Sequence, residues 1–322
     1  WADQLSLSAL EYIISSYNLN NRRNEIASAV TLFIVLQRDK NILSEEIIPF
    51  TESLDINVKP LSHIECREYI SLELDEDDWS EEFMDQLISH SNGNPFYISE
   101  WLHFIQRRGA EKFKDFYSKI PDNLNALILS RIDALKITTK NTLQVASVIG
   151  HEFYDKVVSD IQEKIDQFES DCNQDLSRLV KNNLIVKNLN LDYLYNFKSL
   201  ITRDVTYKSI LRSNREILHL NVGEAIEGLF SNNIQSFYYQ LADHFDRGGS
   251  EVKAIEYLEY AARKAQDIFD NNKAIEFYSR LLEKVRDSDV ERSIDYQLSK
   301  CKVLELIGDW EDAKEIMIEL LE

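Results

Sequence analysis

Glycine and proline are scarce in this sequence, with 8 and 4 residues among 322. Because both residues interrupt helices, their scarcity favours a mainly helical chain with short connections. The three cysteines, Cys66, Cys172 and Cys301, lie far apart, which argues against a disulfide framework and is typical of a reducing compartment. None of the six histidines has zinc-ligand spacing with a cysteine or another histidine.

Long apolar runs are also missing. The longest, residues 27–36, has ten residues, about half of what a membrane span requires. No stretch has the pattern of a signal peptide. We therefore expect a cytoplasmic protein that has no membrane partner.

The charge is strongly acidic, because 36 Lys and Arg residues face 56 Asp and Glu residues, a formal net charge of −20. Such a surface repels phosphate backbones, so nucleic acid is an unlikely partner. Hydrophobic residues make up 44% of the chain, which supports packed cores rather than disorder.

The first fifty or so residues have the pattern of the end of an α/β unit. Residues 6–17 carry apolar residues at helical spacing, and residues 29–36 are β-branched and apolar on both faces, as in a central parallel strand. Arg38 follows that strand, at the edge where open α/β sheets bind ligands. One helix and one strand cannot form a sheet. We therefore expect an excerpt whose preceding sheet strands lie before Trp1.

Helical patterns dominate from residue 61 onward. Ser62 and Glu65 form a predicted capping box at the start of a helix over 62–74. Helices are also expected over 79–89 and 97–108, with a corner at Gly93, Asn94 and Pro95 between them. Gly93 and Asn94 tolerate positive φ, and Pro95 suits a first helical position. This corner presents its atoms in one fixed place, which suits a small-molecule contact as well as an ordinary helix turn.

The middle of the chain alternates helices with a strand pair. Helices are expected over 123–135, 139–149, 171–182 and 200–211, and strands over 184–187 and 193–197. This order fits a winged-helix unit.

The last hundred residues read as helical hairpins. The segments AIEYL (254–258) and AIEFY (274–278) echo each other, and AKEIM (313–317) is a looser copy. A small residue followed by a large one is tetratricopeptide-like spacing, but the intervals of 20 and 39 residues make the repeats degenerate.

Taken in order, these pieces resemble the carboxyl-terminal half of AAA-related ATPases of the signal-transducing NTPase (STAND) type. Four stretches carry the resemblance: WADQLS (1–6), SNGNPFYISEWL (91–102), IPDNLNALILSRIDAL…ASVIGHEF (120–153) and NFKSLITRDVTYKSILRSNREILH (196–219). The resemblance implies a mainly α chain. Its parts would be the end of a P-loop core (1–55), a helical lid (56–118), a winged-helix domain (119–212) and tetratricopeptide-like repeats (213–322).

The resemblance also implies roles for single residues. Arg38 matches the sensor 1 arginine that detects the terminal phosphate of the nucleotide, although a solvated charge at a strand end is the simpler interpretation. Pro95, with Gly93 and Asn94, matches an element whose proline lies against adenine. Lys198 and Ser199 stand where relatives carry a phosphate-contacting histidine, so a strong lock on bound ADP is in doubt. Arg203 and Asp204 keep the family pattern, and we expect their role to be structural.

No Gly-x-x-x-x-Gly-Lys-Ser/Thr motif is present, so these residues alone cannot cradle phosphates and Mg²⁺. The Walker B acids would also lie before Trp1. We therefore expect no catalytic residues here, and ATP or ADP with Mg²⁺ only together with an amino-terminal ATPase core.

The main hypothesis is a regulatory nucleotide-binding switch with a protein or effector on the repeats and an output domain such as a nucleotide cyclase. The alternatives are an interaction scaffold with a vestigial core and, third, a winged-helix transcription regulator.

Overall fold

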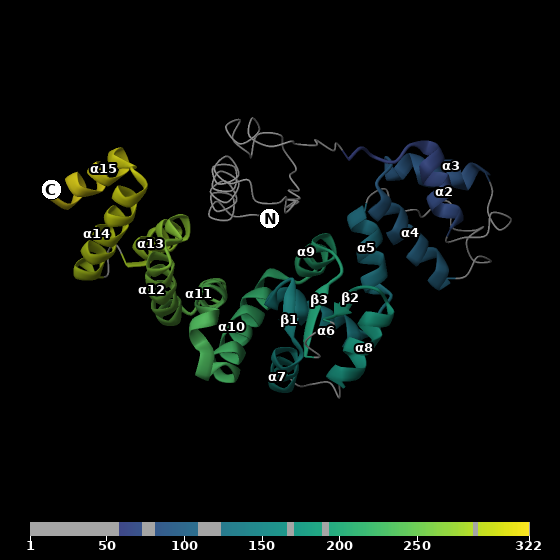
Figure 1. Cartoon of the computed structure of the whole chain (residues 1–322). Helices are drawn as coiled ribbons and strands as arrows, with labels where there is room; N and C mark the ends of the chain where they lie inside the picture. Colours follow the sequence, from purple (N-terminus) through teal and green to yellow (C-terminus); the bar gives the residue numbers. More distant parts are fainter. Residues whose placement is uncertain are drawn as a thin grey trace, which may run out of the picture.

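The computed structural model describes residues 58–72, 81–108, 124–165, 171–188, 193–285 and 289–321. Within these ranges the chain is mainly helical, with fourteen α-helices and a three-stranded antiparallel sheet (Figure 1). The predicted helix and strand of residues 1–55, and with them Arg38, lie outside the described residues.

Helices α2 (His63–Ser71), α3 (Glu81–Ser91) and α4 (Pro95–Arg108) form one hydrophobic core, to which Leu127 of the next helix also belongs. The predicted capping box is confirmed, since the Ser62 hydroxyl accepts from the Glu65 N–H and the Glu65 carboxylate accepts from the Ser62 N–H. The most deeply buried side chains of this core include Ile70, Ile98 and Trp101. Cys66 and Ile70 lie four residues apart on α2, and Ile98 and Trp101 lie three apart on α4. This helical spacing is why the sequence predicts the two helices well.

The sheet lies in the middle of the chain, within a group of five helices. The group comprises α5 (Leu124–Asp133), α6 (Ile137–Ile149), β1 (Glu152–Tyr154), α7 (Asp155–Ile165), α8 (Cys172–Lys181), β2 (Ile185–Lys187), β3 (Leu194–Phe197) and α9 (Leu200–Lys208). Strand β3 is central, pairing Tyr195 with Phe153 of β1 and with Lys187 of β2. The predicted strand pair is confirmed. Sequence reasoning missed β1 and α7.

Six helices follow in series: α10 (Arg212–Leu229), α11 (Tyr238–Arg247), α12 (Glu251–Asp267), α13 (Asn271–Val285), α14 (Val290–Ile307) and α15 (Trp310–Leu321). Each packs against the next, and the 3-10 segment Ser231–Phe237 joins α10 to α11. Figure 1 shows α10–α15 extending from one side of the sheet-containing group and α2–α4 lying on its other side.

The alanines of the sequence echo lie where these helices meet. Ala254, Ala274 and Ala313 are all buried. The large residue four positions later is buried in the first two segments, as Leu258 and Tyr278, but exposed in the third, as Met317. The repeated segments therefore mark helix–helix contacts. The third segment matches the other two less closely in burial as well as in sequence.

None of the helices in the described part of the chain combines the length and apolar character needed to cross a membrane.

Candidate functional site

The corner between α3 and α4 turns the chain where its sequence predicts, but positive φ falls on Asn92 and Gly93 and not on Asn94. Asn92 and Gly93 have φ values of 47° and 73°, and the Gly93 carbonyl accepts from the Leu61 N–H at 2.9 Å. A Cβ at position 93 would lie 2.3 Å from the Leu61 carbonyl oxygen. Both the backbone angle and the close approach of residue 61 therefore require glycine here.

Asn94 and Pro95 start the next helix. The Asn94 side-chain oxygen accepts from the Phe96 N–H at 3.0 Å and the Tyr97 N–H at 3.4 Å, so it caps α4. Pro95 is the first helical residue, where its missing N–H costs nothing. Both side chains are exposed. The corner thus holds a proline ring at the surface in a fixed position.

A buried ion pair connects this corner to the sheet-containing group. Glu100 lies one and a half turns beyond Pro95 in α4 and binds Arg131 of α5, with side-chain exposures of 3% and 1%. Arg131 also donates through Nη2 to the Asn182 carbonyl after α8, at 2.8 Å. The Arg131 Nε–H is buried without a hydrogen-bond partner among the described residues.

Burying both charges carries a large desolvation cost, which their contact offsets only if both partners are present. The pair therefore makes the orientation of α4 depend on α5 and on the end of α8. Sequence reasoning missed it, although Glu100 stands among Tyr97, Ile98 and Trp101 on the apolar face of its helix. A carboxylate in that position was the available signal.

Lys198 and Ser199 lie between β3 and α9. The Ser199 hydroxyl accepts from the Thr202 N–H at 3.0 Å and caps α9, so its hydrogen bonds serve the helix. Lys198 is exposed. Arg203, one turn further on, donates to the Ser147 carbonyl and contacts Asp204, consistent with the structural role expected for this pair.

A chain of hydrogen bonds joins α9, α10 and α11. The Tyr207 hydroxyl and His219 Nε2 are 2.9 Å apart, and His219 Nδ1 lies 2.9 Å from Nδ1 of His244. His244 also hydrogen-bonds the backbone of Ile149, at the end of α6. Because Nδ1 of His244 faces His219, its other nitrogen is left to donate to Ile149. The Tyr207 hydroxyl then donates to His219 Nε2, and His219 Nδ1–H donates to His244 Nδ1.

Burial, with nearby arginines, lowers the pKa of His219 to about 4 and that of His244 to about 3. Both histidines are therefore neutral at pH 7, which the shared hydrogen bond requires. These hydrogen bonds connect α10 and α11, the first of the six helices in series, to α6 and α9 of the sheet-containing group. The wide separation of these residues in the sequence explains why they were not predicted as a pair.

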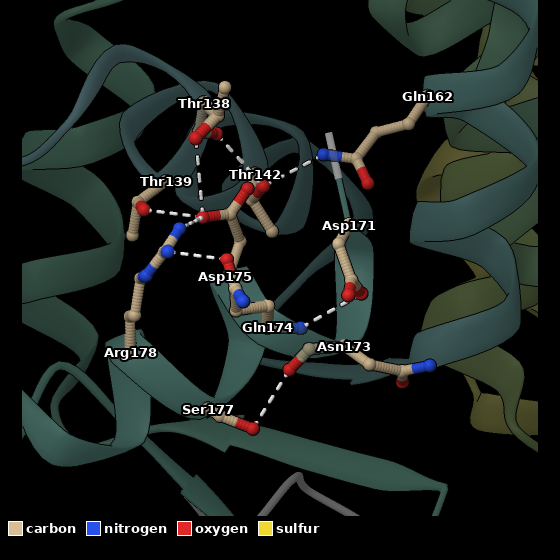
Figure 2. Close-up of polar contacts among 10 residues, drawn as sticks. All are labelled: Thr138, Thr139, Thr142, Gln162, Asp171, Asn173, Gln174, Asp175, Ser177 and Arg178. Atoms are coloured by element: carbon tan, nitrogen blue, oxygen red, sulfur yellow. Dashed lines mark hydrogen bonds and ion pairs between the residues drawn. The ribbon is translucent and has the colours of Figure 1, made fainter. Parts of the chain in front are cut away.

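Asp175 is the centre of a second buried polar cluster, shown in Figure 2. Its Oδ1 accepts from Thr139 at 2.5 Å, from Arg178 at 2.9 Å and from Thr138 at 3.3 Å. Thr142 and Gln162 extend the cluster through a 2.7 Å hydrogen bond. Thr138 and Thr139 lie on α6, Gln162 on α7 and Asp175 on α8, so the cluster joins these three helices. The Gln162 Oε1 is buried without a hydrogen-bond partner among the described residues.

A cavity of about 380 Å³ lies beside α7 and the start of α8. Asp155, Asp160 and Glu163 line it together with Lys156 and Cys172. Burial and the neighbouring acids raise the pKa of the Cys172 thiol to about 12, so it stays protonated and is a poor nucleophile. Among the described residues, no group of three or more His, Cys, Asp or Glu side chains is placed to hold a metal ion.

Of the predicted site residues, Gly93, Asn94 and Pro95 form one corner, and Lys198 and Ser199 form another, between β3 and α9. The hydrogen bonds of the first corner go to Leu61 and α4, and those of Ser199 go to α9. Comparisons with protein-family models, curated proteins and solved structures found no match for this chain. Function is therefore inferred from the residues and their geometry.

Proposed function

We propose that this chain is the lid, winged-helix and repeat portion of a regulatory ATP- and ADP-binding switch of the STAND type. In this proposal residues 56–118 form the lid, 119–212 the winged-helix domain and 213–322 the tetratricopeptide-like repeats. Residues 1–55 would be the end of the ATPase core, with Arg38 as its phosphate sensor. The element order α6, β1, α7, α8, β2, β3, with β3 central in the sheet, is that of a winged helix and supports the middle assignment.

The observation that carries the proposal is the path from Pro95 to the sheet-containing group. Pro95 and Glu100 belong to one helix, and Glu100 binds Arg131, which in turn holds the Asn182 carbonyl. A ligand that contacts the corner and shifts α4 would therefore also shift the proposed winged helix, because the buried Glu100–Arg131 pair connects the two. A switch needs such an element, because a ligand acts only through contacts that differ between two arrangements.

The corner residues fit the base end of a nucleotide rather than its phosphates. Pro95 offers an exposed ring at a fixed place. The sequence contains no phosphate-loop motif, so the phosphates and Mg²⁺ would be held by an ATPase core outside these residues. The exposed Lys198 could add charge from the winged-helix side, whereas Ser199 is already used as a helix cap.

The test uses the protein with its ATPase core and a fluorescent ATP or ADP analogue. We expect Pro95→Ala to lower the affinity for both nucleotides about fivefold. We expect Arg38→Ala to lower the affinity for ATP more than the affinity for ADP. The exposed Lys208 on α9 provides the control variant Lys208→Ala, which should bind like wild type. Unchanged affinity and hydrolysis in the Arg38 variant would reject the sensor role, and unchanged affinity in the Pro95 variant would reject the base contact.

An interaction scaffold with a vestigial core is the second candidate. It is favoured by the large apolar side chains that α14 and α15 leave exposed, including Leu306, Trp310 and Leu321. An intact phosphate loop in the full-length protein, with measurable ATP binding, would count against it. A nucleotide cyclase remains the proposed output domain of the switch, on the family resemblance alone.

The structure adds no support for the third candidate, a transcription regulator. Arg178 of α8, the helix that would read DNA in a winged helix, is bound by Asp175 and Gln174. Lys181 is the other basic residue of this helix. An acidic chain with one unengaged cation on that helix is poorly suited to a phosphate backbone.

A further inference from the structure

The turn between α12 and α13 places a phenylalanine in the left-handed region of backbone space. Phe269 has a φ of 59°. Its N–H donates to the Gln266 carbonyl at 3.1 Å, and the Asp270 N–H donates to the Ala265 carbonyl at 2.8 Å. These two bonds define a Schellman cap, and Phe269 occupies the position where glycine or asparagine is usual.

In the described part of the chain, three other helices end in the same pair of hydrogen bonds, after α8, α11 and α14. Their left-handed residues are Asn183, Gly249 and Gly308, with φ values of 53°, 72° and 84°. At each of them the residue type suits the conformation. A phenylalanine does not, because its Cβ crowds the following carbonyl. Among these four caps of the described residues, position 269 is therefore the exception.

Packing does not explain the exception. The Phe269 side chain is 65% exposed, and its neighbour Ile268 is 56% exposed. Neither belongs to the buried clusters or to the partly buried residues packed against them. An aromatic side chain that costs backbone energy and stays in water contributes nothing evident to the fold. Such local conflicts are typical of functional positions.

A second exposed aromatic lies at the corresponding turn between α14 and α15. Trp310 is 65% exposed there, and Ile307 is also exposed. The helices are packed in series through short connections, so neighbours run antiparallel and alternate turns lie at the same edge (Figure 1). Ile268, Phe269, Ile307 and Trp310, which we name the apolar edge, therefore share one side of the helical series.

Acidic residues flank both turns. Asp267 and Asp270 adjoin Ile268 and Phe269, and Asp309 and Glu311 adjoin Trp310. Aromatic anchors surrounded by charge are a usual design for the centre of a protein interface. Because the surrounding charge is negative, a complementary partner carries a positive rim.

We propose that the apolar edge docks a partner protein that presents apolar pockets bordered by Lys and Arg. Phe269 and Trp310 are the anchors, and the acidic residues beside them select the charge of the partner. The site lies at the turns of the helical series, far along the chain from Pro95. The inference goes beyond the proposed nucleotide switch and stands without it.

The central experiment exploits opposite effects of a single substitution. Phe269→Gly removes the backbone conflict, so the midpoint of thermal unfolding should rise by about 1–3 °C. The same variant should lose binding to a fluorescein-labelled amphipathic helical peptide with a Leu face bordered by Lys. We expect its dissociation constant to increase about tenfold, and a similar increase for Trp310→Ser. A stabilised protein with weakened binding is not the outcome of a general defect.

Two controls isolate the apolar edge. Val252→Ser changes an exposed residue at the start of α12, near the turn at the opposite edge, and should leave peptide affinity unchanged. A peptide with Glu in place of Lys should bind at least about tenfold more weakly to the wild type. Equal affinity of wild type and Phe269→Gly for the Lys peptide would overturn the proposal. Self-association of the wild type that disappears in Phe269→Gly would overturn it too, because the occupant would then be a second copy of this chain.

Discussion

Glu100 and Arg131 bind each other across the junction of α4 and α5, and both side chains are almost completely removed from solvent. The core of the first three described helices also includes Leu127 of α5, and the ion pair adds a polar connection beside that apolar contact. The energetics of this pair therefore contribute to how firmly α4 is held against α5.

Removing one member of this pair should be far more damaging than removing both. Glu100→Ala leaves the Arg131 charge buried without a counterion, and we expect a loss of about 3–5 kcal/mol in the free energy of unfolding. The double variant Glu100→Leu/Arg131→Met should recover most of that loss. Urea titration with hydrogen exchange on α4 and α5 measures both.

A surface pair serves as the control for this prediction. Arg67 and Glu81 lie 2.6 Å apart with side-chain exposures of 35% and 78%, so Glu81→Gln should cost less than about 1 kcal/mol. Equal losses in Glu100→Ala and in the double variant would show that the buried pair is not coupled.

Two glycine-to-alanine substitutions should change the free energy of unfolding in opposite directions. Gly93→Ala combines a φ of 73° with a contact to the Leu61 carbonyl oxygen, so we expect a loss of about 2–3 kcal/mol. Gly228 lies within α10, and an added Cβ would meet no atom within 4 Å. Gly228→Ala should therefore stabilise the protein by about 0.5–1 kcal/mol. Denaturant midpoints measure both, and a neutral Gly93→Ala would contradict the close approach of Leu61.

The paired histidines predict a dependence of stability on pH. The pKa values of His219 and His244 in the folded protein, about 4 and about 3, lie below the ordinary value of 6.5. Below pH 6.5 the unfolded chain takes up protons that the folded chain refuses, so their contribution to stability is complete above pH 6.5 and declines toward pH 3. His244→Asn should lower stability at pH 7 but flatten this decline.

Thermal unfolding between pH 4 and pH 8 checks that prediction. His90 is exposed at the end of α3, and His90→Asn should keep the slope of the wild type. If His244→Asn and wild type lose stability in parallel, the histidine pair is not the source of the slope.

Removing the Asp175 carboxylate should destabilise the polar cluster shown in Figure 2. Asp175→Ala removes the acceptor shared by Thr139 and Arg178. We expect a loss of about 1–3 kcal/mol because the buried Thr139 hydroxyl loses this acceptor and Arg178 keeps only Gln174. Asp171→Ser keeps a capping side chain at the start of α8 and should be nearly neutral. Hydrogen exchange should show the loss of protection in α6 and α8, and an unaffected α6 would contradict the bridging role.

Local features of the fold could be predicted well from the sequence. The capping box of Ser62 and Glu65, the corner at Gly93 and the antiparallel strand pair all depend on residues close together in the chain. Strand β1 was missed because three residues are too few to show a pattern, and it forms only by pairing with β3, some forty residues away.

The candidate site divides in the same way. The sequence by itself determined that the chain turns sharply at Gly93, Asn94 and Pro95, since the positive φ of Gly93 and the fixed ring of Pro95 are properties of those residues. The other left-handed residue is Asn92, and Asn94 instead caps α4. Only the tertiary structure decided that Glu100 meets Arg131, that His219 meets His244, and that Phe269 is left in solvent in a strained turn. These relationships depend on burial and on distance in space, because desolvation and packing are set by the whole fold and not by neighbours in the chain.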